Sequence, residues 1–179
     1  PLRTKKQANT SPISVVIVAF NEATRLPQKI ASVLGSDDAH LIQEILVASD
    51  GSTDNTAEVI ASLNEPRVEL LAFAERRGKP SVLNEAIPQC ANELIVLTDS
   101  RQDLDRRAIA ELTANFADET VGVVSGELVF KAAGNTTTAA HGIGIYWKYE
   151  KFIRKHEGRF RSVPGATGGL YALRRPLFR

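Results

Sequence analysis

The stretch that decides the fold is Glu93-Leu94-Ile95-Val96-Leu97-Thr98-Asp99-Ser100-Arg101. An apolar run ends abruptly in a carboxylate, and the residues that follow are polar. This pattern is typical of a strand buried on both faces of a parallel sheet. In an open parallel sheet, ligands bind just beyond the carboxyl ends of the strands. We therefore expect Asp99 to lie where a ligand binds.

Two earlier stretches end in the same way. The apolar run 13–20 leads into Asn21-Glu22, and the run 44–49 leads into Asp50-Gly51. Residues at helical spacing follow each run, so strands and helices alternate and predict an α/β sheet. The expected strands are 13–20, 44–49, 68–73, 93–98, 121–130 and 170–173. The expected helices begin near residues 26, 56, 79 and 105, and a further helix covers 141–156 after a polar loop at 131–140.

Length and composition set outer bounds on the function. The chain has 179 residues, which is enough for one domain with a sizeable core, and its net charge is +1. This charge gives no strong field for a nucleic acid or an anionic membrane surface. The single cysteine, Cys90, excludes an intramolecular disulfide, and no apolar run is long enough to span a bilayer. Because the chain has no methionine, we expect it to be a fragment of a longer protein.

Two residues at strand ends are candidates for contact with a nucleoside. Asp50 can accept a hydrogen bond from a base N–H or a ribose hydroxyl, or it can be a turn residue that caps the next helix. Phe20 can stack on a base, or it can belong to the core. From the residues alone, both interpretations stay open at each position.

A third candidate site is cationic. Arg76, Arg77 and Lys79 surround Gly78 at the start of an expected helix. Backbone N–H groups, the helix dipole and these cations together would hold a diphosphate, although a solvated basic loop is the plainer interpretation. Asp99 with Asp103 could bind Mg²⁺ or Mn²⁺ through oxygen atoms, or serve only in a turn.

Four segments, taken in order, closely resemble the family 2 glycosyltransferases: Ser14–Glu22, Ala48–Asp54, Gly78–Asn84 and Leu97–Asp99. Gly165–Arg175 resembles the acceptor-side turn and strand of the processive-type members of that family, which are often embedded in membranes.

The resemblance implies an A-type glycosyltransferase fold: a Rossmann-like, mostly parallel sheet flanked by helices, incomplete at the C-terminus. It divides the chain into a flexible segment 1–12 and a glycosyltransferase domain 13–179. Within that domain, 13–104 is the nucleotide-binding half and 105–179 begins the acceptor-binding half. The implied roles are Phe20 against uracil, Asp50 accepting the imide N–H, Glu22 holding the nucleoside, Lys79 with Arg77 on the diphosphate, Asp99 as first carboxylate of an Asp-x-Asp metal motif, and Thr167 and Gly168 on the acceptor side.

The sequence departs from the family pattern at two points. Arg101 replaces the second carboxylate of the metal motif, so either Asp103 assists Asp99 in binding Mg²⁺ or Mn²⁺, or Arg101 carries part of the charge instead. The family's base is an aspartate beyond the strand that ends at Arg175. Since no acidic residue follows Glu157, we expect the base to lie beyond Arg179.

The resemblance implies an enzyme that transfers a sugar, with inversion, from a UDP-sugar to a saccharide or lipid-linked acceptor. Such an enzyme would make a polysaccharide or glycolipid, at the cytoplasmic face of a membrane in the parent protein. The alternative is a nucleotide-binding or assembly module of the same type that is catalytically incomplete. A nucleotidyltransferase would instead need a glycine-rich, basic loop after the first strand, and Asn21-Glu22-Ala23 is not one.

Overall fold

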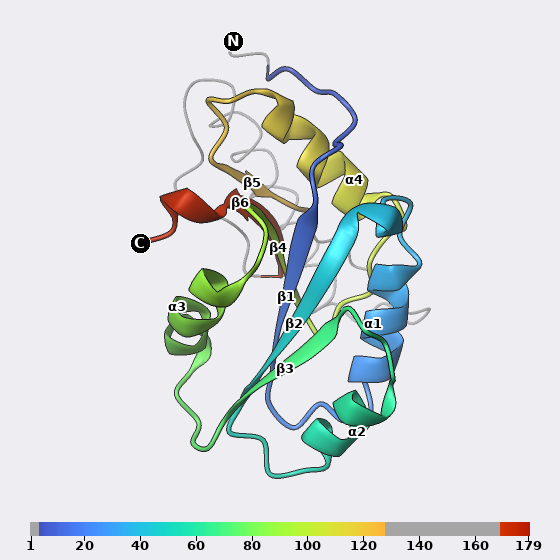
Figure 1. Ribbon diagram of the computed structural model, residues 1–179, viewed down its shortest axis with the longest axis vertical. Coiled ribbons are helices and arrows are strands. Elements are labelled where there is room, and N and C mark those ends of the chain that lie inside the picture. The colour runs from blue at the N-terminus through green and yellow to red at the C-terminus, as the bar shows by residue number, and fades with distance from the viewer. Residues whose placement is uncertain (1–3, 128–168) are drawn as a thin grey trace, which may run out of the picture.

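The protein is described by a computed structural model that covers residues 4–127 and 169–179. Six strands form one sheet in the order β3-β2-β1-β4-β6-β5 (Figure 1). Four of them run parallel: β1 (Ile13–Ala19), β2 (Ile42–Asp50), β3 (Val68–Phe73) and β4 (Leu94–Asp99). The strand β6 (Leu170–Arg174) is antiparallel to β4, and β5 (Val123–Ser125) is antiparallel to β6.

Helices cover both faces of this sheet (Figure 1). One face carries α1 (Leu26–Leu34), α2 (Thr56–Ser62) and α4 (Ala108–Thr113), and the other carries α3 (Lys79–Gln89). Three short 3₁₀ helices complete the described elements: η1 (Ala39–Leu41), η2 (Ala114–Ala117) and η3 (Arg175–Leu177). The predicted α/β class is therefore confirmed.

The apolar residues of the central strands alternate between two cores, as the period of a strand requires. In β1, Val15 and Ile17 face the core beneath α1, α2 and α4, whereas Val16 packs in the core beneath α3. Because both faces are covered, these strands are apolar almost throughout, which is why they stand out in the sequence.

The register of the parallel strands brings their carboxyl ends together. Ala19 pairs with Ser49, and Val18 pairs with Asp99. The expectation that three strands deliver polar residues to one edge of the sheet is confirmed. We call this edge, with the loops 20–25, 50–55, 74–78 and 99–103 that follow the strands, the carboxyl edge.

The N-terminal segment and the C-terminal third are described in part. The Lys6 side chain pairs with Glu111 at 3.1 Å, and the Gln7 amide donates to the Ala114 carbonyl. The predicted loop 131–140, the predicted helix 141–156 and part of the predicted strand 121–130 lie outside the described residues. Within the described ranges, no helix is both long and apolar enough to cross a bilayer.

Candidate functional site

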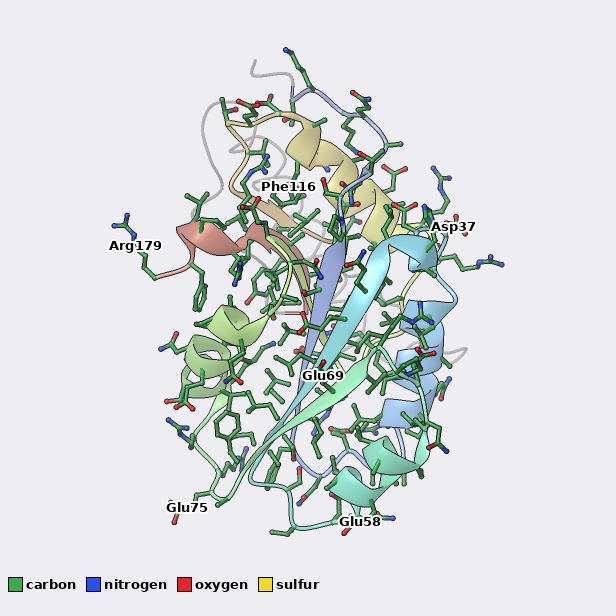
Figure 2. The ribbon with its side chains drawn as sticks, viewed as in Figure 1. Asp37, Glu58, Glu69, Glu75, Phe116 and Arg179 are labelled. Carbon is green, nitrogen blue, oxygen red and sulfur yellow. The ribbon has the colours of Figure 1, made fainter. Side chains whose placement is uncertain are left out.

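The loops of the carboxyl edge lie together at one end of the molecule. Figure 2 labels Glu58 of α2 and Glu75 of the loop after β3 at this end, whereas Asp37 and Phe116 lie toward the other end. Loops after neighbouring parallel strands meet here because all four strands run in the same direction.

Asp50, the last residue of β2, organises the loop that leads into α3. Its side chain is 4% exposed, and its two carboxylate oxygens accept the backbone N–H groups of Arg77 (2.6 Å) and Gly78 (3.0 Å). The sequence analysis expected backbone N–H groups of this loop to hold a diphosphate, but the amides of Arg77 and Gly78 are bonded to Asp50. The predicted contact of Asp50 with a base stays a prediction, and the structure gives the residue a positioning role.

Two glycines make this arrangement possible. Gly51 and Gly78 both have positive φ, at +68° and +84°, which favours glycine. A Cβ on Gly51 would lie 2.4 Å from the backbone nitrogen of Arg76, so the turn after β2 contacts the loop after β3 directly. A side chain at Gly51 would separate the two loops, whereas Gly78 is required only for its positive φ.

Asn21 and Asp54 tie the loop after β1 to the loop after β2, and the sequence analysis missed both roles. The Asn21 side-chain oxygen accepts the Thr53 amide at 2.8 Å. Asp54 accepts the Ala23 amide with one oxygen, and the amide and hydroxyl of Thr56 with the other. The Thr56 hydroxyl is the main cause of a lowered pKa of Asp54. Asp54 thus bonds the amide of Thr56, the first residue of α2, whereas Asp50, which the sequence also offered as a helix cap, bonds the loop after β3 instead.

The arginines of the loop after β3 pack on aromatic rings. The Arg76 guanidinium lies 4.2 Å from the centroid of the Phe20 ring, a cation–π distance. Arg77 lies over Phe73, at 5.0 Å, and forms an ion pair with Glu85 of α3. The prediction placed Arg77 with Lys79 on a diphosphate, but here its charge is met by Glu85. The predicted contact of Phe20 with uracil stays a prediction, and in the structure the Arg76 guanidinium lies over the ring.

Lys79 and Asp99 meet across the carboxyl edge. The Lys79 ammonium, at the start of α3, lies 2.5 Å from one oxygen of Asp99 at the end of β4. The Gln102 side-chain amide is 3.5 Å from the other oxygen. Both side chains are about one-third exposed, so a ligand can reach them. The structure therefore brings together the two residues that the sequence assigned to the diphosphate and the metal.

Glu22 and Arg101 form a second pair beside the first. Glu22 is 4% exposed and accepts from Arg101 Nε at 2.6 Å and from Arg25 at 3.2 Å. The predicted contact of Glu22 with a nucleoside stays a prediction. Its observed role is to hold two arginines at the edge of the sheet.

Lys29 supports this region from the buried side of α1, which the sequence analysis did not foresee. Its ammonium donates to the Gln102 carbonyl at 2.8 Å, and the side chain is 3% exposed. Burial lowers the pKa of Lys29 to about 8, although the nearby charges of Asp99 and Asp103 act in the opposite direction and raise it. Burial likewise raises the pKa of Tyr171 on β6, and Asp99 adds to this shift.

The donor set at this edge does not fit a divalent cation well. Mg²⁺ and Mn²⁺ prefer several oxygen ligands, mostly carboxylates. Asp99 is bonded to Lys79, Glu22 is bonded to Arg101, and the side chain two residues after Asp99 is a cation. No group of three or more His, Cys, Asp or Glu side chains that could hold a metal occurs within residues 4–127 and 169–179. Thr167 and Gly168, predicted on the acceptor side, lie outside the described residues.

The sheet has four parallel strands, and the loops after them carry cations and carboxylates at the carboxyl edge, which is where open α/β sheets bind ligands. The mannosyltransferase PcManGT from Pyrobaculum calidifontis, solved in complex with GDP-Man and Mn²⁺, has the same fold. Its TM-score is 0.74 at 25% identity, over 97% of this chain and 49% of that one. The fold is thus the A-type glycosyltransferase fold. Residues 14–179 match the family described as Glycosyl transferase family 2, and the chain belongs to that family.

Two further proteins are similar to this chain. It is 29% identical, over 116 residues, to the poly-beta-1,6-N-acetyl-D-glucosamine synthase of Staphylococcus aureus, a match that covers 64% of this chain and 28% of the relative. Glucosyl-3-phosphoglycerate synthase from Mycobacterium tuberculosis, in complex with Mn²⁺, UDP and glucosyl-3-phosphoglycerate, shares the fold with a TM-score of 0.62 at 20% identity, over 94% of this chain and 58% of that one. The match therefore covers about a quarter of the synthase, and the chain spans about half the length of the two solved enzymes.

Proposed function

We propose that this chain binds the nucleoside diphosphate of a sugar donor at the carboxyl edge, as part of a glycosyltransferase. The observation that carries the proposal is the bond between Lys79, the first residue of α3, and Asp99 at the end of β4. Asp50, at the end of β2, holds the loop that leads to Lys79. Family membership supports the reaction class. Residues 13–104 would form the nucleotide-binding half, and 105–179 would begin the acceptor-binding half.

The reaction is proposed to proceed with inversion. An acceptor hydroxyl oxygen forms a bond to the anomeric carbon, and the bond from that carbon to the distal phosphate oxygen breaks. The diphosphate leaves with the electron pair, and the hydroxyl proton passes to a base. Fixed cations such as Lys79 stabilise the leaving charge in this scheme. No described residue is assigned as the base.

The donor and acceptor follow the relatives. We propose a UDP-sugar as donor, since UDP is bound to the Mycobacterium tuberculosis enzyme, although the Pyrobaculum calidifontis enzyme holds GDP-Man. A saccharide or lipid-linked acceptor fits the polysaccharide made by the Staphylococcus aureus synthase, as its name states. Association of a longer parent with the cytoplasmic face of a membrane belongs to the same proposal. Mn²⁺ accompanies both solved enzymes, but no step is assigned to a metal here.

The test is calorimetric titration of the chain with UDP and with GDP in a buffer containing Mn²⁺. We expect saturable binding, tighter for UDP than for GDP. Lys79→Gln should weaken it about tenfold or more, because a charge-assisted hydrogen bond to phosphate is lost. Lys6→Gln, which removes an exposed lysine paired with Glu111, should leave it unchanged. If neither nucleotide binds, the proposal is wrong.

A further inference from the structure

The cationic side of the carboxyl edge suggests how the diphosphate charge is met. Arg101 stands two residues after Asp99, at the position where the resemblance led us to expect the second carboxylate of a metal motif. A cation at this position repels a divalent metal ion and attracts a phosphate. The exchange therefore changes the sign of the charge at one position of the site.

Arg101 is held in place rather than loosely solvated. Its Nε atom bonds the Glu22 carboxylate at 2.6 Å, and Glu22 is almost fully buried at the end of β1. Since β1 and β4 are neighbours, this bond crosses from the loop after one strand to the loop after the other. The Arg101 side chain is nevertheless 70% exposed. The guanidinium is thus anchored through Nε and open to a ligand.

The turn that carries Arg101 is fixed from below as well. Lys29 donates to the Gln102 carbonyl at 2.8 Å from the buried side of α1. Gln102 packs against Gly169, where a Cβ would lie 2.6 Å from its side-chain nitrogen. The position of Arg101 is therefore set by contacts with the loop after β1, with α1 and with Gly169, the residue before β6.

Lys79, the first residue of α3, supplies a second cation, and its side chain reaches Asp99. Its ammonium bonds Asp99 Oδ1, so it is directed to the end of β4, the strand that leads into Arg101. A guanidinium and an ammonium together carry the same formal charge as one divalent ion. Both groups donate charge-assisted hydrogen bonds to phosphate oxygens, and the planar guanidinium can do so through two nitrogens.

We propose that Arg101 and Lys79 bind the diphosphate in place of a divalent cation, so that this chain binds its nucleotide without a metal. Glu22 serves as the positioning residue of Arg101. The inference rests on the proposed function, because it concerns the same nucleotide site. Unlike the proposed function alone, the inference excludes a strict requirement for Mg²⁺ or Mn²⁺ in nucleotide binding.

The experiment is calorimetric titration with UDP, in parallel buffers that contain EDTA, Mg²⁺ or Mn²⁺. For the unchanged chain, we expect dissociation constants within about threefold of each other in the three buffers. Arg101→Gln should weaken binding about tenfold or more in all of them, since one cation is lost. Arg101→Asp, which restores the carboxylate of the motif, should abolish binding in EDTA and regain it in part with Mn²⁺.

Matched variants separate the site from general effects. Arg106→Gln removes an exposed arginine paired with Asp37, so binding should not change. Arg101→Lys keeps the charge and should retain more affinity than Arg101→Gln. Circular dichroism and thermal melting of each variant check that it is folded.

Three outcomes overturn the inference, and they are distinguishable. If the unchanged chain binds UDP with Mn²⁺ but not in EDTA, the nucleotide site exists and the metal-free mode is wrong. If UDP and GDP bind in none of the buffers, the proposed function fails and the inference fails with it. Equal affinities of Arg101→Gln and the unchanged chain would also remove Arg101 from the site.

Discussion

At the scale of single residues, Asp50 explains how a buried charge is tolerated at the ligand-facing edge. A carboxylate that is 4% exposed needs donors in place of water, and the amides of Arg77 and Gly78 provide them. Those amides in turn need an acceptor, because both residues lie in the loop before α3, outside any helix or strand. The Asp50 carboxylate and the loop before α3 therefore stabilise each other. As a consequence, Lys79, which follows this loop, lies at the carboxyl edge.

Asp50→Ala should destabilise the fold and weaken nucleotide binding together. Two amides lose their acceptor, which costs about 2–3 kcal/mol of the free energy of unfolding. UDP affinity should fall at least about tenfold, because Lys79 follows the released loop directly. Urea unfolding followed by circular dichroism measures the first effect, and calorimetric titration measures the second.

The control for this variant is Glu75→Ala, which removes the same charge from an exposed position of the same loop. It should change the free energy of unfolding by less than about 0.5 kcal/mol. Equal effects of the two variants would show that net charge, rather than the bonds to Arg77 and Gly78, is responsible.

At the scale of elements, the strands could be predicted more fully than the side-chain contacts between them. The strand Val68–Phe73 was predicted at the observed bounds, and the strand ending in Asp99 was shifted by one residue. Runs buried on both faces are apolar throughout, so sequence alone marks them. The partners of Arg77 could not be foreseen, because its ion pair with Glu85 depends on how the loop enters α3.

Lys29 is a missed residue for which the sequence does hold a signal. It lies three residues after Leu26 and four before Val33, so helical spacing places it on the buried stripe of α1. A lysine on an apolar stripe needs a partner, which here is the Gln102 carbonyl. The partner itself is 73 residues away in the sequence, and only the packing of α1 against the loop after β4 brings it near.

The buried ammonium of Lys29 should make stability depend on pH. The pKa of Lys29 is lowered from 10.5 to about 8 in the folded chain. Between these values the unfolded chain binds the proton and the folded chain does not, so the free energy of unfolding rises with pH. Below pH 8 the cost of the buried charge is fully present, and above pH 10.5 it is gone. This contribution amounts to at most about 3 kcal/mol.

The measurement compares the unchanged chain with Lys29→Met in urea unfolding from pH 7 to 10.5. The free energy of unfolding of the unchanged chain, minus that of the variant, should rise across this range. The pKa of Cys90 is raised from 9.0 to about 12, so the contribution of this thiol to the free energy of unfolding falls with pH above about 9. Both the unchanged chain and Lys29→Met should therefore also be measured with Cys90→Ala. A difference that stays constant with pH would contradict the assignment of the shift to Lys29.

At the scale of the whole molecule, the amino ends and the carboxyl ends of the parallel strands carry different kinds of polar groups. At the amino edge, Ser14, Glu44 and Asn92 form a buried polar cluster: Glu44 accepts from the Ser14 hydroxyl and the Ala91 amide, and the Ser14 oxygen accepts from Asn92. These groups satisfy one another and join β1, β2 and the loop before β4. The carboxyl edge keeps exposed cations instead. Polar residues at strand ends were visible in the sequence at both edges, but only the carboxyl edge was recognised, because ligands are expected there.

Cys90 reports whether α3 stays packed on the sheet, since it follows the last residue of that helix and is 1% exposed in the core beneath it. Burial raises the pKa of its thiol from 9.0 to about 12. The thiolate is the reactive form, so at pH 8 its population in the folded chain should be roughly 1000-fold below that of the unfolded chain. We therefore expect a thiol reagent to label native Cys90 at least about 100-fold more slowly than Cys90 in urea. Labelling at the rate of the unfolded chain would mean that α3 opens readily from the sheet.

Saturating UDP should slow the labelling of Cys90 further. Lys79, at the other end of α3, would then be bonded to the nucleotide, and an opened α3 would have to give up that bond.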